Sequence, residues 1–363
     1  MFEIIFLIAV SLYFIQSFIF LAGATKKFNR LSVEELPTVT IIVAARNEEE
    51  NILRCLESLD KLVYPKGKLE VILINDNSTD STLDKIEKFI SGKPLFKCIT
   101  TKKNIGNLKG KTNALANGLE LATGEIILTT DADCSVSPTW ALSLASFYQK
   151  DVAMVCGYTS QESYNAFSGM QSLDFLYLLT VAGGAINFNI PLSCIGNNMS
   201  YRKSVYNEVG GYENIPFSVT EDFKLLKTIF NLKKYKIIYP LESEAHVVSK
   251  PCQKLKQLYW QRKRWGIGGL DSDFAGFFVM AVGFITQICI LLTPFIFSFT
   301  VLNLLFFKLA IDFLFLYPSL KKLNLTKTYK YFFAFQLYFI VYVIALPLTV
   351  LLSRKVIWKG RKY

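Results

Sequence analysis

The sequence predicts an α/β domain with a mostly parallel sheet, flanked by transmembrane helices on both sides. From Leu36 to about Tyr239, short runs rich in Val and Ile alternate with stretches of helical spacing. This alternation is typical of a parallel sheet covered by helices on both faces. Apolar runs occupy residues 4–22, 274–317 and 331–352, and about 20 apolar residues span a bilayer as a helix. We therefore expect a membrane protein with one large globular domain between its spans.

The composition agrees with a protein that works at a membrane. The 363 residues are 52% hydrophobic, and the mean hydropathy is +0.32. A net charge of +11 favours anionic partners such as a membrane surface, nucleic acid or a phosphorylated substrate. The seven cysteines are odd in number and show no C-x-x-C spacing, which indicates free thiols in a reducing compartment. The single histidine, His246, disfavours a multi-histidine zinc site, and we expect it to have a structural role.

The first element is predicted to be a transmembrane anchor over residues 1–24. A cleaved signal peptide is the alternative, because the small residues 22–24 resemble a cleavage site. However, the acidic Glu3 stands where a signal peptide has its basic region. Three basic residues follow the run, within positions 26–30, so the positive-inside rule places the next domain in the cytoplasm. We expect an integral protein of the inner cell membrane.

The globular domain is expected over residues 36–245. In open α/β sheets, ligands bind beyond the carboxyl ends of the strands, so the residues that follow each strand are candidates for a site. The predicted strands are Val39–Ala45, Leu69–Ile74 and Glu125–Thr129, and the predicted helices are Asn47–Leu59, Ser81–Ile90 and Lys111–Leu121.

Acidic and amide side chains follow each of these strands, in segments 44–48, 75–80 and 131–133. Asp and Asn also favour turns and helix N-caps for purely local reasons, so part of this pattern can be structural. Asp131 and Asp133 form a D-x-D pair directly after a buried strand. Two carboxylates at this position suit a hard divalent cation, Mg or Mn.

A third acidic group is Thr220-Glu221-Asp222, which precedes a helical run over Phe223–Phe230. One interpretation is a helix cap, because carboxylates are favoured near the positive end of a helix. The other is a general base, because an ionised carboxylate beside an acceptor hydroxyl can take its proton. The residues by themselves leave both interpretations open.

A basic and aromatic segment is expected over residues 246–272, with the sequence QRKRW at 261–265. Basic and aromatic residues interleaved just before a transmembrane segment fit an amphipathic helix that lies in the headgroup region. A nucleic-acid surface can share this composition. The adjacent membrane segment argues against it, so we expect no nucleic-acid partner.

About three transmembrane helices are expected over residues 273–353, followed by a basic tail at 354–363. The run 274–317 is long enough for two spans, with Pro294 near its middle. Three spans after a cytoplasmic domain would place the basic tail outside, against the positive-inside rule. Either one segment does not cross or charge does not set the orientation of this end.

Taken in order, five motifs resemble membrane-bound family-2 glycosyltransferases with the GT-A fold. The match covers Pro37 to Trp265, and although each motif is weak alone, their order and spacing are specific. The resemblance implies a Rossmann-like catalytic domain, a nucleotide-sugar donor, a divalent metal and an inverting transfer. The motifs are TIIVAARNEE at 40–49, INDNSTD at 74–80, TTDAD at 129–133, TED at 220–222 and QRKRW at 261–265.

On the donor side, the resemblance implies roles for individual residues. Asn75 and Asn77 replace the first Asp and the Gly of the family's D-D-G-S-T-D stretch. Asn tolerates the left-handed backbone that Gly often supplies, so the turn can be retained. The implied donor residues are Ala44, Arg46 and Glu48 at the base and ribose, Asp76 at the base, Lys111 near the donor, and Asp131 and Asp133 at the metal and the sugar nucleotide.

On the acceptor side, the resemblance implies that Asp222, beside Glu221, is the catalytic base. It places Gln261, Arg264 and Trp265 near the diphosphate and the acceptor. Charge on the departing nucleoside diphosphate would be stabilised by the metal and by the guanidinium of Arg264.

The expected reaction is transfer of one sugar, with UDP as the default donor nucleotide, to a lipid hydroxyl, as in the similar ceramide- and carotenoid-directed glucosyltransferases. The apolar stretch 167–190 would be either core or a lip for a lipid acceptor, and the ending WKGRKY is similar to tails of such enzymes. The first alternative is a processive polysaccharide synthase of the cellulose, chitin or hyaluronan type, working as an oligomer. The second is a membrane scaffold without catalysis.

Overall fold

The computed structural model describes residues 1–101, 104–358 and 361–362. The chain divides into two compact units. One unit comprises Met1–Lys26, Gln161–Ser193 and the chain from Pro251 onward, and the other comprises Lys27–Ser160 and Cys194–Lys250. We call the first the membrane unit and the second the sheet unit.

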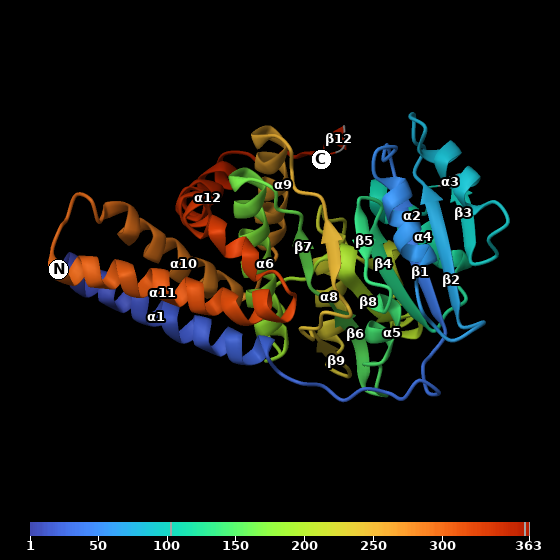
Figure 1. The fold of residues 1–363 in the computed structure, drawn as a ribbon, viewed down its shortest axis with the longest axis horizontal. Coiled ribbons are helices and arrows are strands. Elements are labelled where there is room, and N and C mark those ends of the chain that lie inside the picture. Colours follow the sequence, from blue (N-terminus) through green and yellow to red (C-terminus); the bar gives the residue numbers. More distant parts are fainter. Residues whose placement is uncertain (102–103, 359–360, 363) are drawn as a thin grey trace. The chain divides into compact units, whose positions relative to one another are not determined.

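The sheet unit is built on a seven-stranded sheet with the order β3-β2-β1-β4-β8-β6-β9. Strand β1 pairs in parallel with β2 and β4, and β2 pairs in parallel with β3. Strand β8 runs antiparallel to both β4 and β6 (Figure 1). The strands are β1 Val39–Ala45, β2 Leu69–Asn75, β3 Phe96–Thr100, β4 Ile126–Asp131, β6 Val152–Cys156, β8 Met199–Arg202 and β9 Lys236–Ile238.

Helices and a smaller sheet complete this unit. The smaller sheet has the order β5-β10-β7, formed by Cys134–Val136, Val247–Ser249 and Thr159–Gln161. The helices are α2 Ile52–Asp60, α3 Thr82–Ile90, α4 Gly110–Leu121, α5 Trp140–Ala145, α7 Lys203–Glu208 and α8 Glu221–Asn231, with short 3-10 turns at η1 Gly196–Asn198 and η2 Tyr212–Asn214.

The three predicted strands are confirmed, and so are the predicted helices, although the first helix begins at Ile52 and not at Asn47. Strand β1 has the predicted bounds, β2 is one residue longer, and β4 extends through Asp131. The central strands are buried on both faces, so they appear in the sequence as continuous apolar runs. Strand β3 and the short strands after β4 were not predicted, because three to five residues carry too little periodicity to be recognised.

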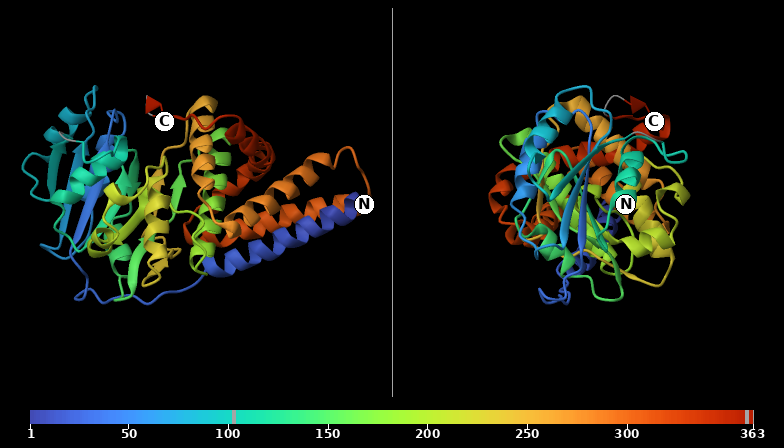
Figure 2. Two further views of the ribbon diagram at one scale, coloured as in Figure 1. Left: turned by 180° about the vertical axis from the view of Figure 1, so that it is seen from behind. Right: turned by 90° about the vertical axis from the view of Figure 1, so that its right-hand side faces the viewer.

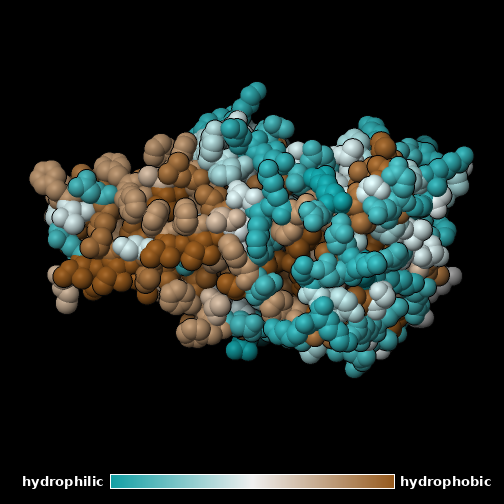
Figure 3. Space-filling model, turned by 90° about the horizontal axis from the view of Figure 1, so that it is seen from below, coloured by the Kyte–Doolittle hydropathy of each residue, from teal (hydrophilic) through white to brown (hydrophobic). Residues whose placement is uncertain are grey.

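The membrane unit consists of long apolar helices. Helix α1 lies beside both α10 and α11, as Figure 1 and the left view of Figure 2 show. On the face shown in Figure 3, these helices carry mostly hydrophobic residues. The helices are α1 Phe2–Ala24, α6 Ala166–Ile186, α9 Leu255–Gly269, α10 Phe274–Leu292, α11 Phe299–Lys322 and α12 Phe332–Leu352, with a 3-10 turn η3 at Thr326–Tyr331.

Within the described ranges, four helical segments are long and apolar enough to cross a membrane. They are Phe2–Ala24, Phe274–Leu292, Phe299–Lys322 and Thr326–Leu352. These are the helices predicted on both sides of the globular domain. In the predicted basic tail, residues 359–360 and 363 lie outside the described part of the chain, and the two-residue strands β11 (Ile357–Trp358) and β12 (Arg361–Lys362) pair with each other.

Helix α6 belongs to the membrane unit, although the sequence analysis placed residues 161–193 inside the globular domain. It carries apolar residues around its whole circumference, and such a helix needs partners on several sides. It packs against α1, α11 and α12. The contact with α1 is close: a Cβ atom at Gly184 would lie 2.0 Å from the backbone oxygen of Phe20. Small residues permit this approach between apolar helices.

A polar network joins the helices inside the membrane unit. Lys308 Nζ lies 2.7 Å from Asp312 Oδ2, and both side chains are 0% exposed. Gln336 on α12 accepts a hydrogen bond from Lys308 (2.9 Å) and donates one to Asp312 (2.7 Å). Tyr13 on α1 donates to Asp312 Oδ1 (2.6 Å) and shares a hydrogen bond with Tyr177 on α6 (2.6 Å). The buried ion pair on α11 therefore contacts α1 and α12 directly, and Tyr13 links it to α6.

Candidate active site

The candidate site begins at the carboxyl edge of the parallel strands. Ala45 at the end of β1 is paired in register with Asn75 of β2, and Ala44 is paired with Asp131 of β4. The segments that follow the three strands therefore start beside one another. Ala44 itself is partly exposed at this edge.

The loops after β1 and β2 are bonded to each other. Asn47 accepts a hydrogen bond from the backbone N–H of Thr79 (2.9 Å), and its own N–H donates to Ser78 Oγ (3.1 Å). Asn47 and Asn77 both have a φ of 52°, in the left-handed region. Asn77 therefore adopts the backbone conformation that Gly often supplies, as expected from the sequence.

Arg46, Glu48 and Asp76 lie in these two loops. Arg46 Nη1 donates to the backbone oxygen of Asp76 (2.8 Å) and lies 4.0 Å from its Oδ2. Glu48 and Asp76 are each 6% exposed. Glu48 Oε2 accepts a hydrogen bond from Asn51 (2.7 Å). The structure thus brings the predicted base and ribose residues into neighbouring, bonded loops.

Lys111, in the first turn of α4, connects the D-x-D segment to helix α8. Its Nζ lies 2.7 Å from Asp131 Oδ1 and 3.2 Å from Glu221 Oε1. Burial disfavours its charge, but Asp131 and Glu221, with a smaller contribution from Asp222, raise the pKa of Lys111 well above its ordinary value. Lys111 is therefore a fixed cation among three carboxylates from two segments of the sheet unit.

Asp222 accepts two backbone hydrogen bonds. Its Oδ2 accepts from the N–H of Gly196 (2.7 Å), and its Oδ1 accepts from that of Phe223 (2.8 Å). Thr129 of β4 donates its hydroxyl to the oxygen of Gly196 (2.7 Å), which anchors η1 to the sheet. A Cβ atom at Gly196 would lie 3.3 Å from Asp222 Oδ2 and 3.5 Å from Lys111 Nζ. Sequence reasoning missed Gly196, because no motif marks it.

The acidic residues at the end of β4 and just after it fit a divalent cation. Asp131 and Asp133 offer carboxylate oxygens, and Mg²⁺ is usually bound by one or two carboxylates together with water and phosphate. Burial raises the pKa of the neighbouring thiols of Cys55 and Cys134, so they remain protonated and are poor ligands. Within the described residues, no group of three or more His, Cys, Asp or Glu side chains is placed to hold a metal ion. Asp131 and Asp133 by themselves offer only carboxylate oxygens, the ligand type that suits Mg or Mn.

The QRKRW residues lie on α9 of the membrane unit. Trp265 stacks on Phe175 of α6, with ring centroids 5.5 Å apart and an interplanar angle of 19°. Gln261 Oε1 accepts a hydrogen bond from Arg262 (2.9 Å). Gln261, Arg264 and Trp265 are all partly buried.

His246 makes a structural contact within the sheet unit. Its Nε2 is 2.8 Å from Ser160 Oγ, and burial lowers its pKa to about 4. All seven cysteines lie in the described ranges and are free thiols. Both observations agree with the roles expected from the sequence.

The shifted pKa of His246 predicts a pH dependence of stability. Because the folded protein binds this proton less readily than the unfolded chain, the stability from neutral His246 is complete above its ordinary pKa of 6.5 and is lost as the pH falls towards 4. Between pH 7 and pH 5, the wild type should lose about 1–2 kcal/mol more than His246→Gln. Thermal unfolding of both proteins in detergent at the two pH values measures this difference. Equal losses would contradict the prediction.

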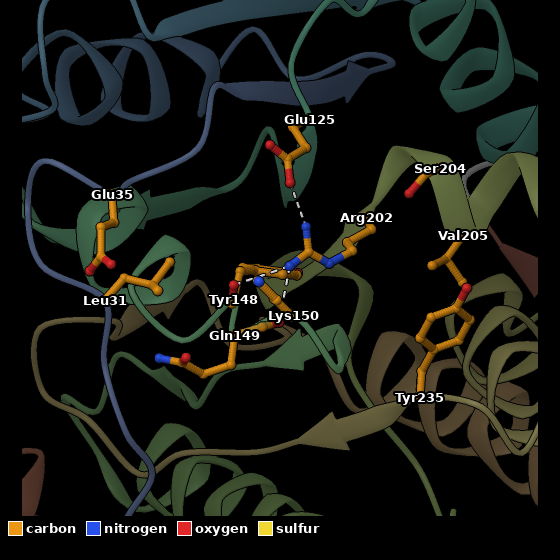
Figure 4. A pocket seen from close by; sticks show the side chains of 10 residues that line it. All are labelled: Leu31, Glu35, Glu125, Tyr148, Gln149, Lys150, Arg202, Ser204, Val205 and Tyr235. Carbon is orange, nitrogen blue, oxygen red and sulfur yellow. Dashed lines mark hydrogen bonds and ion pairs between the residues drawn. The ribbon is translucent and has the colours of Figure 1, made fainter.

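The structure also has a cavity of about 520 Å³ at the opposite edge of the sheet (Figure 4). It lies where β4 begins and β8 ends, and Glu125 and Arg202 form an ion pair in its wall. The Arg202 guanidinium also donates to the backbone oxygens of Val152 (2.9 Å) and Gln149 (3.0 Å). These contacts give Arg202 a structural role, so this cavity is separate from the acidic site.

Comparisons with known proteins agree with this arrangement. Residues 40–210 match Glycosyl transferase family 2, and residues 126–352 match Glycosyl transferase family group 2. A mannosyltransferase from Pyrobaculum calidifontis, solved with GDP-Man and Mn²⁺, has a similar fold, with a TM-score of 0.62 and 19% identity over 96% of this chain and 99% of that one.

Curated relatives are similar over part of their length. A beta-monoglucosyldiacylglycerol synthase from Nostoc sp. is 30% identical over 64% of this chain and 49% of its own. A poly-beta-1,6-N-acetyl-D-glucosamine synthase from Staphylococcus aureus is 28% identical over 68% of this chain and 58% of its own. A probable glycosyltransferase from Bacillus subtilis is 28% identical over 66% and 57%, respectively. The chain thus spans about half the length of the curated relatives it matches.

The matched residues include both the acidic cluster of the sheet unit and the apolar helices of the membrane unit. The fold, the order of the motifs and the family match over 126–352 agree with one another. The chain therefore belongs to Glycosyl transferase family group 2 and has the GT-A fold.

Proposed function

We propose that this protein is an inverting glycosyltransferase that moves a sugar from a nucleotide donor to the hydroxyl of a membrane lipid. The observation that carries the proposal is the cluster of Lys111, Asp131, Glu221 and Asp222 at the carboxyl edge of the sheet. The carboxylates of this cluster can bind a metal ion or accept a proton. The Lys111 ammonium can bind an anionic diphosphate. Four apolar helices in the same chain support a membrane acceptor.

The donor occupies the loops after β1 and β2 in this proposal. Arg46, Glu48 and Asp76 contact the base and ribose, with Ala44 at the floor of the pocket. Hydrogen bonds between the two loops hold these side chains before the donor arrives. Such preorganisation lowers the conformational cost of binding. UDP is our default nucleotide.

Asp131 and Asp133 would hold Mg or Mn beside the donor diphosphate. When bound, the metal would supply Lewis-acid stabilisation of negative charge on the leaving group. Lys111 holds Asp131 in place through its ion pair and adds a positive charge at the same edge. A charge that is fixed before the reaction stabilises developing negative charge without further reorganisation.

Asp222 is the proton acceptor in this scheme. The acceptor hydroxyl attacks the anomeric carbon, the bond from that carbon to the diphosphate oxygen breaks, and the bonding electrons leave with the nucleoside diphosphate. The hydroxyl proton passes to a carboxylate oxygen of Asp222. Backbone N–H groups of Gly196 and Phe223 orient this carboxylate. A single in-line displacement inverts the anomeric centre.

Gln261, Arg264 and Trp265 complete the scheme near the diphosphate and the acceptor. Arg264 supplies a guanidinium, which can bind phosphate oxygens in a bidentate manner. The positive-inside rule supports a cytoplasmic catalytic domain at the inner membrane, because basic residues follow the first span at positions 26–30.

The alternative to a lipid acceptor is a growing polysaccharide chain. The Nostoc relative is named as a diacylglycerol glucosylating enzyme, which favours a lipid. The Staphylococcus aureus relative is named as a polysaccharide synthase, which favours a polymer. We favour the lipid because α6 and the four apolar segments form one membrane unit in a single chain.

The experiment that tests the function uses membranes that contain the full chain. They are incubated with a panel of radiolabelled nucleotide sugars, and organic and aqueous extracts are analysed by mass spectrometry. A short, organic-extractable glycolipid supports the proposal. A long, water-soluble polymer supports the alternative, and the absence of both transfer and donor hydrolysis supports a scaffold without catalysis.

Removal of divalent metal is expected to lower the rate of transfer strongly. Lewis-acid stabilisation is worth several kcal/mol, so EDTA should lower the rate about 10²-fold or more. Adding Mg²⁺ or Mn²⁺ in excess should restore it. The measurement is the initial rate of glycolipid formation with and without chelator, and full activity in EDTA would remove the metal from the scheme.

A further inference from the structure

Arg262 is a buried arginine within the QRKRW sequence that has no role in the scheme above. Its side chain is 3% exposed, and it lies in α9 between Gln261 and the remaining motif residues. A buried guanidinium is costly unless all of its charge is compensated. The contacts of Arg262 therefore indicate which groups compensate its buried charge and what role the side chain has.

Two contacts anchor Arg262 to other helices of the membrane unit. Its Nη2 lies 2.7 Å from Asp174 Oδ2 of α6, and Asp174 is 0% exposed. Its Nε donates to the Tyr338 hydroxyl of α12 (2.9 Å). The rigid, planar guanidinium can contact Asp174 and Tyr338 at the same time through different nitrogen atoms. A lysine ammonium on a flexible side chain cannot reproduce this geometry.

Two further contacts reach the motif residues themselves. Arg262 Nη1 donates to Gln261 Oε1 (2.9 Å), and its Cζ lies 4.3 Å from the centroid of the Trp265 ring. Because Arg262 only donates, the Gln261 amide must turn its oxygen towards it. The NH₂ group of Gln261 is then turned away from Arg262.

We propose that Arg262 is a positioning residue, anchored by Asp174 and Tyr338, that presents the Gln261 amide as a donor and fixes the Trp265 ring for acceptor and diphosphate binding. This inference rests on the proposed function. Arg262 itself does not touch the substrates; it acts through its two neighbours in the motif. The ligand class recognised by Gln261 is an oxygen acceptor, either a phosphate oxygen or a sugar or lipid hydroxyl.

The first test removes the buried pair without leaving a single buried charge. The double variant Asp174→Leu/Arg262→Met is compared with Lys308→Met/Asp312→Leu, which removes another buried ion pair of the membrane unit away from α9. Transfer is measured with UDP-glucose and dioleoylglycerol in mixed micelles, or with the pair that the donor panel identifies in their place. We expect the first variant to lose about 10- to 100-fold in kcat/KM for the acceptor, and the control to retain wild-type kinetics.

The second test asks whether Arg262 acts through Gln261. Arg262→Lys, which keeps a buried cation, is combined with Gln261→Ala in a double-mutant cycle. If Arg262 positions Gln261, the alanine substitution should cost much less in the Arg262→Lys background than in the wild type. This cycle decides the question even where the Asp174→Leu/Arg262→Met protein fails to fold.

Two outcomes would overturn the inference. One is wild-type acceptor kinetics in a folded Asp174→Leu/Arg262→Met protein, and the other is strictly additive effects in the cycle. Failure of the proposed function is a separate result, because the wild-type protein would then form no glycolipid in the same assay.

Discussion

Replacing Asp222 with asparagine is expected to lower the turnover of sugar transfer by about 10³-fold, while nucleotide-sugar binding stays close to that of the wild type. A positioned general base contributes about 10²–10⁴-fold, and asparagine cannot accept the hydroxyl proton. The variant should remain folded, because the asparagine oxygen can still accept a hydrogen bond from the Gly196 N–H. The loss should therefore appear in kcat and not in donor affinity.

The measurement combines acceptor-saturated initial rates with calorimetric titration of the nucleotide sugar. A matched control is Asp84→Asn, which removes an exposed carboxylate from the first turn of α3. Glu221→Gln is a second comparison, because Glu221 contacts Lys111 and should affect donor binding as well as the rate. Near-normal turnover in Asp222→Asn would refute the assignment of the base.

The second large effect is expected inside the membrane unit. Asp312→Leu leaves Lys308 buried at 0% exposure without its carboxylate partner. Breaking a buried ion pair in this way costs about 3–5 kcal/mol, because the remaining charge is neither solvated nor paired. Gln336 can still accept from Lys308, but a neutral amide does not neutralise the charge. We expect Asp312→Leu to lower the yield of folded protein and its unfolding temperature strongly.

Removing both charges should largely restore stability. In Lys308→Met/Asp312→Leu, apolar side chains of similar size replace the pair, and such replacements are often neutral or stabilising. Thermal unfolding in detergent and the monodisperse fraction by size exclusion measure the effect. Lys321→Met, at an exposed position of the same helix, is the control and should change stability little. If the double variant is as unstable as Asp312→Leu, the network has a further role that charge balance does not explain.

The strands that carry the donor side of the site could be predicted because their information is local. In the sequence, strand β1 is a continuous apolar run that ends at a polar segment. The structure has the strand at these residues and places the polar segment in a loop at the end of the strand. The same holds for β4 and the acidic pair after it. In contrast, no residue near Gly196 in the sequence indicates that the Gly196 N–H donates a hydrogen bond to Asp222. That contact depends on η1 and α8 being brought together by the fold.

The sequence by itself determined the parallel sheet, the apolar spans and the acidic residues at the strand ends, because each depends on the order and spacing of neighbouring residues. Only the tertiary structure decided that Lys111 pairs with Asp131 and Glu221, that α6 packs with the membrane helices, and that Arg262 is held by Asp174. These partners are far apart along the chain. Burying a charge or a polar helix face is favourable only when the matching group arrives from another element, and periodicity carries no information about that group.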